Sequence, residues 1–135
     1  MDNQKIKILL LEDNPDDARE ISNILKKENI QFEITLVDTK TKYEQQLAEA
    51  PPEIILCDHS LPSFNSTEAL DILKNSGLKI PYILVSGAVS EEFAVTIMKS
   101  GADDYILKDR LHRLPSAILS ALYKFEVNKQ RLEAA

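Results

Sequence analysis

Two kinds of segment alternate along the chain. Short apolar runs rich in Ile, Leu and Val are separated by longer stretches in which apolar residues recur at helical spacing, and this unit repeats five times. The runs predict strands at residues 6–11, 33–37, 54–57, 82–85 and 105–107. Four runs are almost continuously apolar, which is typical of parallel strands covered by helices on both faces, whereas the second is mixed and suits a sheet edge. The pattern therefore predicts an α/β domain around a mostly parallel sheet.

The segments between the runs carry signals for helix ends. Asn14 is a predicted N-cap, because Pro15 follows at the first helical position. A fourth helix is expected after Ser90, with a buried stripe made of Phe93, Ala94, Ile97 and Met98. The fifth helix is expected to start around Pro115 and to run to the end of the chain.

Composition narrows the class of protein. The chain has 135 residues with 44% hydrophobic residues, which fits one globular domain, and nothing in it suggests an internal boundary. Its 16 basic and 22 acidic residues give a net charge of −6, which argues against binding to nucleic acid or to an anionic membrane. The single cysteine, Cys57, cannot form an internal disulfide, and no signal peptide or membrane-spanning run is present. We expect a cytoplasmic protein.

Residues with carboxylate, hydroxyl or ammonium side chains follow four of the five predicted strands: Glu12 and Asp13, Asp58, Ser86, and Lys108. In open α/β sheets, ligands bind at the carboxyl ends of the strands, so these side chains are expected to meet. Three carboxylates that lie close together favour a bound cation, and hard oxygen donors without imidazole or thiolate favour Mg²⁺ or Mn²⁺. A divalent ion, a lysine and a hydroxyl around one carboxylate match the needs of phosphoryl transfer. Asp58 is the best candidate nucleophile, and it would form an acyl phosphate.

The order of these residues resembles that of the response-regulator receiver domain of two-component signalling, also called the CheY-like domain. The resemblance covers roughly residues 5–125 and rests on four motifs: Glu12-Asp13, and residues 58–62, 86–88 and 101–108. It implies a three-layer, doubly wound (βα)5 fold of the flavodoxin-like kind. The five-stranded parallel sheet would have the order 2-1-3-4-5, with two helices on one face and three on the other.

The resemblance also implies roles for single residues. Asp58 would accept a phosphoryl group from a histidine kinase or a histidine phosphotransfer protein. The ligands of Mg²⁺, or of Mn²⁺ in its place, would be Asp13, Asp58, the backbone carbonyl of Ser60 and, through a metal-bound water, Glu12. Ser86 and Lys108 would contact the phosphoryl group, and before transfer Lys108 would pair with Asp58. Ser86 and Tyr105 would form the conformational switch.

Some residues depart from the family pattern or have no assigned role. Asp109 follows Lys108 where the family often has proline, so a cis peptide bond is not expected there. His59 is interpreted as an exposed residue without a partner. Asp103 is interpreted as a solvated turn residue, and Cys57 as a small core residue.

The C-terminal segment is predicted to extend the fifth helix. Residues 1–125 form the expected receiver domain, and residues 126–135 an extension of the fifth helix. Two alternatives stay open: the chain is a stand-alone relay, or the extension leads into a downstream domain of a larger sensory kinase or regulator. Apolar residues recur there at seven-residue spacing: Leu111, Ile118, Phe125 and Leu132. Phe125 and Leu132 would lie exposed unless another helix covers them. A homodimer through the fourth helix, fifth strand and fifth helix is one expected way to cover them.

Two alternatives to a phosphoacceptor switch stay open. The first is a pseudo-receiver that acts only as a protein-interaction module, although the intact set of site residues argues against it. The second is a Mg²⁺-dependent phosphohydrolase, which needs a general acid or base and a substrate-covering cap that the sequence does not offer. A receiver would assist its own phosphorylation and dephosphorylation, and it would not act as an enzyme on an external substrate.

Overall fold

The computed structural model describes residues 5–134 apart from residue 88, with side chains described as far as residue 131. Its strands form one parallel sheet of order β2-β1-β3-β4-β5, as predicted. The strand bounds are β1 Ile6–Leu11, β2 Phe32–Val37, β3 Ile54–Cys57, β4 Tyr82–Ser86 and β5 Asp104–Leu107. The mixed second run does form an edge strand, and its residues alternate between partly buried and exposed over most of its length.

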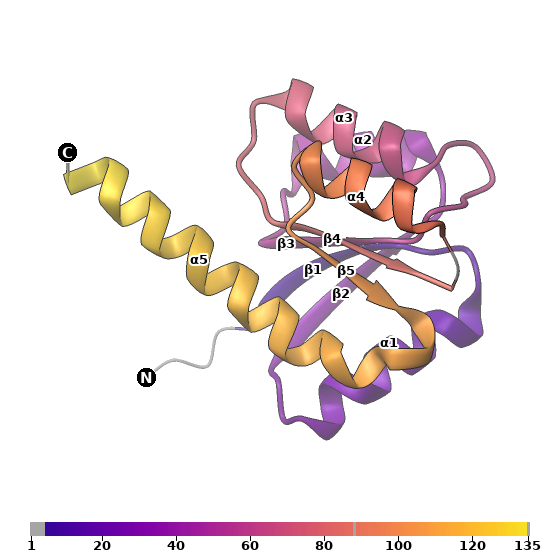
Figure 1. Cartoon of the computed structure of the whole chain (residues 1–135). Helices are drawn as coiled ribbons and strands as arrows, with labels where there is room; N and C mark the ends of the chain where they lie inside the picture. Colours follow the sequence, from indigo (N-terminus) through magenta and orange to yellow (C-terminus); the bar gives the residue numbers. More distant parts are fainter. Residues whose placement is uncertain (1–4, 88, 135) are drawn as a thin grey trace.

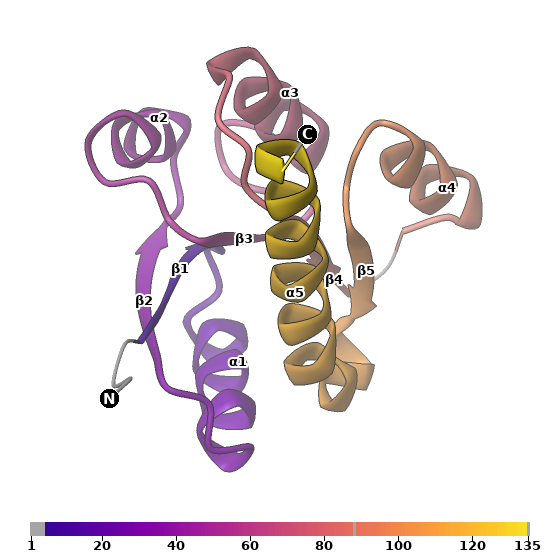
Figure 2. The same cartoon turned by 90° about the vertical axis from the view of Figure 1, so that its left-hand side faces the viewer.

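Helices cover both faces of the sheet, two on one side and three on the other, as expected. The helix bounds are α1 Pro15–Lys27, α2 Lys40–Glu49, α3 Ser66–Ser76, α4 Glu91–Lys99 and α5 Leu114–Ala134, with a short 3₁₀ segment at Lys108–Arg113. Figures 1 and 2 show α1 and α5 on one face and α2, α3 and α4 on the other. No helix in the described part of the chain is both long and apolar enough to cross a membrane.

Alternation along the buried strands divides the core into two layers. Leu9 and Leu11 of β1 pack on the side of α2, α3 and α4, whereas Ile8 and Leu10 pack on the side of α1 and α5. The same alternation continues through β3 and β4. Successive side chains of a strand point to opposite faces, so a continuously apolar strand needs a helical layer on each side.

The predicted helix caps are present. The Asn14 side chain accepts hydrogen bonds from the backbone N–H groups of Asp16 and Asp17 at 2.9 and 3.2 Å, so the first turn of α1 begins directly after β1. At the other end of a helix, Gly77 follows α3 with a φ of 81°, a left-handed conformation that favours glycine. The caps fix where the loops at the two edges of the sheet begin and end.

The expected buried stripe of α4 is largely wrong. Ile97 is its buried residue, while Phe93 and Ala94 are half-buried and Met98 is 40% exposed. The helix packs beside β5, at the edge of the sheet, so fewer of its side chains reach the core than in a central helix. The first turn of α4 is therefore held by few apolar contacts.

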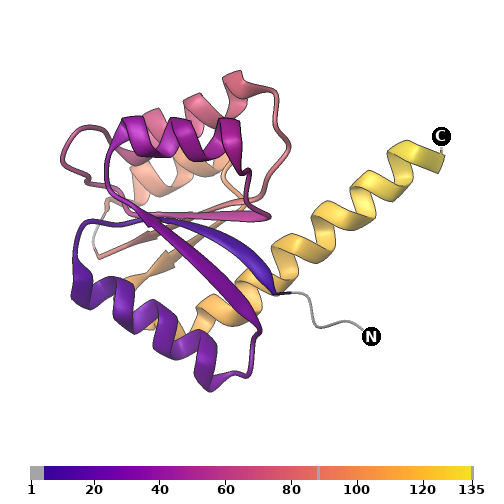
Figure 3. The same ribbon diagram turned by 180° about the vertical axis from the view of Figure 1, so that it is seen from behind.

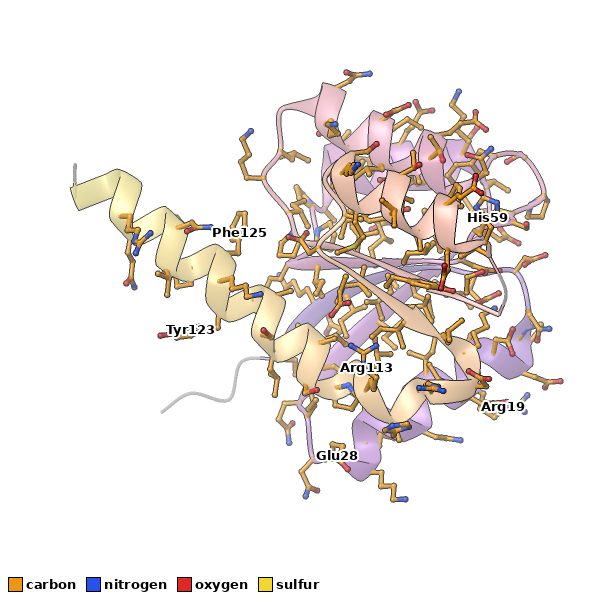
Figure 4. The ribbon with its side chains drawn as sticks, viewed as in Figure 1. Arg19, Glu28, His59, Arg113, Tyr123 and Phe125 are labelled. Atoms are coloured by element: carbon orange, nitrogen blue, oxygen red, sulfur yellow. The ribbon has the colours of Figure 1, made fainter. Side chains whose placement is uncertain are left out.

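The C-terminal helix runs without a break through Ala134 and extends beyond the sheet, as Figure 3 shows from behind. Phe125 is half-buried rather than exposed. It lines a pocket of about 370 Å³ together with residues of α3 and the loops at the amino edge of the sheet, among them Leu70, Pro81 and Asp103. Tyr123 is 71% exposed and projects from the opposite side of the helix (Figure 4). The domain itself covers part of Phe125, and the side chain of Leu132 lies outside the described residues.

Candidate functional site

The carboxyl edge of the sheet brings the predicted site residues together. Glu12 and Asp13 follow β1 and Asp58 follows β3, and these two strands are direct neighbours in the sheet. One oxygen from each of the three carboxylates lies within 4.8 Å of the others. Ser86 ends β4 and lies opposite Leu107 of β5. Lys108 follows Leu107 directly, so it lies at the same edge of the sheet. The carboxylate cluster predicted from the strand ends is thus present in the fold.

Lys108 is the cation of this cluster. Its Nζ lies 2.6 Å from Asp17 Oδ2, 2.8 Å from Glu12 Oε1 and 3.4 Å from Asp58 Oδ2. Burial alone would lower the pKa of Lys108, but its hydrogen bonds to Asp17 and Glu12 and the charge of Asp58 outweigh this effect and raise the pKa. The ammonium group therefore stays charged at neutral pH and faces the Asp58 carboxylate.

Glu12 is the most buried acidic residue of the site, with 2% of its surface exposed. Its Oε1 pairs with Lys108, and its Oε2 accepts a hydrogen bond from the backbone N–H of Asn14 at 3.2 Å. Burial raises the pKa of Glu12, the hydrogen bond from Lys108 lowers it, and the Asp58 charge raises it further. Both oxygens of this buried side chain therefore have a partner.

Asp58 is held by its own loop and remains accessible. The backbone N–H of His59 donates to Oδ1 at 2.8 Å, Lys108 approaches Oδ2, and the side chain is 13% exposed. Asp13 is exposed beside it. These hard oxygen donors, open to solvent on one side, fit an octahedral ion such as Mg²⁺ that keeps several waters.

Ser86 and Tyr105 flank the carboxylate cluster on the side of β4 and β5. Ser86 is buried, with 4% exposure, and the adjacent Gly87 borders open space where a side chain would stand. Tyr105 is partly exposed, and burial together with the neighbouring Asp109 raises the pKa of its hydroxyl. Ala88, the last residue of the 86–88 motif, lies outside the described residues. Ser60, exposed in the loop after β3, forms an antiparallel bridge with Asn65.

The sequence interpretation missed the contacts of two residues, one in the carboxylate cluster and one beside it. Asp17 makes the shortest contact to Lys108, and the available signal was its place in the first turn after the Asn14 cap. His59 was expected to be exposed and without a partner, which is wrong. It is partly buried, its Nδ1 is hydrogen-bonded to Ser66 Oγ at 2.8 Å, and its ring packs against Phe93. Both contacts are tertiary, so local pattern did not reveal them.

Cys57 and Asp103 lie in the surroundings that the sequence predicted. Cys57 is fully buried, and burial raises the pKa of its thiol to about 12. Asp103 is an exposed loop residue, but it also has a structural role that was not predicted: its Oδ2 accepts the backbone N–H of Tyr82 at 2.7 Å, and its own N–H donates to the Tyr82 carbonyl at 2.7 Å. The trans peptide after Lys108 agrees with the expectation, since the described residues contain no cis bond.

Comparison with known proteins gives a consistent result. The family model described as the response regulator receiver domain matches residues 8–119. The nitrate/nitrite response regulator protein NarL of Escherichia coli K12 is 33% identical over 131 residues, which cover 95% of this chain and 58% of that protein. The chain therefore spans little more than half the length of this curated relative.

Solved structures resemble the fold closely. The signal receiver domain of a Luxo repressor protein from Vibrio parahaemolyticus has a TM-score of 0.85 at 23% identity, covering 94% of this chain and 97% of that one. The phosphorylated cyanobacterial phytochrome response regulator RcpA has a TM-score of 0.71 at 26% identity, covering 85% of this chain and 91% of that one.

Proposed function

Because this chain belongs to the response regulator receiver domain family of two-component signalling, we propose that it is a phosphoacceptor switch in which Asp58 receives the phosphoryl group. The observation that carries the proposal is the convergence of Lys108 and three carboxylates on the exposed carboxyl edge of the sheet. A set of like charges held this close is costly for the fold alone, so it favours a role in binding charged ligands.

The transfer step follows from the placement of Asp58. A carboxylate oxygen of Asp58 attacks the phosphorus of a phosphohistidine, so a P–O bond forms while the P–N bond breaks. The imidazole leaves as a neutral ring when its second nitrogen carries the proton. Lys108 neutralises negative charge on the transferred group, and the Ser86 hydroxyl donates a hydrogen bond to one of its oxygens. Attack of water on the acyl phosphate later returns the free carboxylate.

The donor set supports a divalent ion beside Asp58. We propose that Asp13, Asp58 and the backbone carbonyl of Ser60 hold Mg²⁺, with Mn²⁺ as a substitute, and that Glu12 contacts it through water. When bound, the ion supplies charge neutralisation for the phosphoryl oxygens. The partnership of Glu12 with Lys108 and Asn14 supports a second role for this carboxylate, namely holding the lysine in place.

Partners and output are proposed from the relatives. One of the similar solved structures is that of a phosphorylated response regulator, and several curated relatives are DNA-binding response regulators longer than this chain. We propose that the chain works in the cytoplasm, with a histidine kinase or histidine phosphotransfer protein as donor and an output protein or downstream domain as receiver of the signal. The surface of α4, β5 and α5 is the proposed dimer face. Analytical ultracentrifugation with and without a phosphoryl analogue tests the dimer, and monomers in both samples would contradict it.

Intact mass measurement tests the central proposal. After incubation with Mg²⁺ and acetyl phosphate or phosphoramidate, the chain should gain the mass of one phosphoryl group, and Asp58→Asn should abolish the gain. Asp71→Asn, an exposed change on α3, is the matched control and should behave as the wild type. Uptake by Asp58→Asn at the wild-type rate would overturn the assignment.

The same samples separate the two alternatives. A pseudo-receiver would show no mass gain in the wild type, even with an excess of donor. A phosphohydrolase would release many equivalents of inorganic phosphate from a simple phosphate monoester, a compound that a receiver does not consume.

A further inference from the structure

His59 links three segments that meet beside the phosphoacceptor. Its backbone N–H donates to Asp58 Oδ1 at 2.8 Å, and its Nδ1 is hydrogen-bonded to Ser66 Oγ at 2.8 Å. Its ring centroid lies 4.4 Å from that of Phe93, with the two rings inclined by 58°. Figure 4 shows His59 close to the end of α4 that follows β4. One residue thus contacts the loop after β3, the start of α3 and the first turn of α4.

Ser66 gives the His59 ring a fixed support. It is fully buried, its N–H donates to the His59 carbonyl at 3.0 Å, and its own carbonyl accepts the Tyr82 hydroxyl at 2.8 Å. The imidazole is therefore held from the side of α3 through a residue that is itself tied to β4. A ring restrained in this way moves together with its backbone.

The first turn of α4 has few other attachments. Ile97, one turn further along, is the buried residue of this helix, and Val95 and Met98 are exposed. Phe93 is half-buried, and its aromatic neighbour is His59. Phe93 also packs against the core layer under α2, α3 and α4, so its contact with the His59 ring is one of two attachments of the helix start, and it is the one that leads to the loop of Asp58.

Phosphorylation changes the acceptor to which His59 is bound. A carboxylate oxygen of Asp58 carries part of a negative charge, and that charge leaves the carboxyl group when an acyl phosphate forms. The hydrogen bond from the His59 N–H then weakens, because charge-assisted hydrogen bonds are stronger than neutral ones. We propose that His59 is a positioning residue that transmits this change from Asp58 to α4 through its ring contact with Phe93.

This inference rests on the proposed function, and NMR with a phosphoryl analogue tests it. Amide spectra of the ¹⁵N-labelled chain are recorded with Mg²⁺ during titration with beryllofluoride. His59→Asn keeps a hydrogen-bonding atom near the Nδ1 position but removes the ring, and Phe93→Leu removes the other ring. In either variant the shift changes across α4 should fall about two-fold or more, while the titration midpoint stays within about two-fold of the wild type. Substitution of a residue with only a structural role would change the α4 shifts and the titration midpoint together.

The double variant makes the test specific to the contact. If the contact between the two rings transmits the change, the double variant His59→Asn/Phe93→Leu reduces the shift changes in α4 no further than either single change does. Additive losses, or an undiminished α4 response in both single variants, would overturn the inference. His112→Asn, an exposed histidine, and Met98→Ala on α4 are the controls and should respond as the wild type.

A third variant and the response of the wild type complete the test. Should either ring variant fail to fold, Ser66→Ala, which removes the Nδ1 partner and leaves both rings, should give a smaller loss in the same direction. An unreduced α4 response in that variant would count against the inference. Absence of both phosphoryl uptake and beryllofluoride shifts in the wild type would instead overturn the proposed function, before any His59 variant is considered.

Discussion

The two edges of the sheet use acidic residues in opposite ways. At the amino edge, two carboxylates bond backbone amides: Asp103 accepts from Tyr82 at 2.7 Å, and Glu53 accepts from Lys7 at 3.0 Å. At the carboxyl edge, carboxylates lie within 4.8 Å of one another, and Lys108 is shared by three acidic side chains. The first arrangement completes the ends of strands, whereas the second concentrates negative charge.

The difference separates structural from functional use of the same residue type. A carboxylate bonded to a backbone amide stabilises the fold without any ligand. Lys108 pairs with Glu12, Asp17 and Asp58, and Asp13 lies beside two of them, so the cluster keeps negative charge that a bound cation relieves. Changes at the carboxyl edge should therefore alter ligand binding, and changes at the amino edge should alter stability.

The largest expected effect is on Mg²⁺ binding. Asp13→Ala should weaken Mg²⁺ affinity by about ten- to a hundred-fold, or about 1.4–2.7 kcal/mol, because one carboxylate and a carbonyl make a poor site for an ion that loses water reluctantly. Titration calorimetry measures this directly. Asp103→Asn at the other edge is the control and should bind Mg²⁺ as the wild type does. Equal affinity in Asp13→Ala would refute the proposed ligand set.

The amino edge should respond in stability. Phe125→Ala should lower the free energy of unfolding by about 1–2 kcal/mol, less than for a fully buried phenylalanine, because its side chain is half-buried in the pocket with Leu70 and Pro81. Tyr123→Ala is the matched control on the exposed side of α5, and it should change stability by no more than about 0.5 kcal/mol. Urea unfolding measures both. Equal losses would mean that the pocket does not hold the helix.

A smaller effect, a gain in stability, is expected for a substitution at the carboxyl edge when no metal is bound. Asp13→Asn should raise the free energy of unfolding by about 0.5–1 kcal/mol at low salt, because it removes one of the mutually repelling carboxylates. Added Mg²⁺ should erase the advantage by stabilising the wild type. The measurement is urea unfolding in chelator and in Mg²⁺. A variant less stable than the wild type in chelator would contradict the assumed repulsion.

The smallest effect concerns pH at the amino edge. Burial raises the pKa of Asp103 above 3.8, although the hydrogen bond from Tyr82 and the charge of Lys124 lower it. The folded state thus holds this proton more tightly, so the contribution of Asp103 to stability is fully present below pH 3.8 and falls as pH rises through its folded pKa. Relative to Asp103→Asn, the wild type should lose roughly a few tenths of a kcal/mol over this range, since solvent screens an exposed group. Parallel pH profiles for the two proteins would exclude the effect.

The sequence predicted the fold correctly where the apolar pattern of a segment depends directly on which of its faces are buried. Continuous apolar runs predicted β1, β3 and β4, and the mixed run predicted the edge strand β2, because burial on one face or on both leaves a different period. The clustering of Glu12, Asp13 and Asp58 followed from strand ends alone, since parallel strands deliver their carboxyl ends to one edge.

The burial and the contacts that the sequence did not predict depend on tertiary packing. Met98 matched the helical period of a buried stripe, but α4 packs at the edge of the sheet and leaves it 40% exposed. Phe125 continued a seven-residue repeat, and the residues that line a pocket with it come from α3 and from loops that are distant in sequence. Asp17 belongs to no motif, and the 58–62 motif does not indicate what the His59 ring contacts; only the folded chain brings these residues to Lys108 and Phe93.

The hydrogen bond between Asp17 and Lys108 joins residues 91 positions apart, and this separation has a consequence for synthesis. A ribosome makes the acidic residues of the site first and the lysine only after β5 is complete. A nascent or truncated chain that ends before β5 holds the carboxylates without their cation, and it leaves β4 as an unpaired edge. Such a chain cannot assemble a complete site, so incomplete products of translation are unable to accept a signal in place of the finished domain.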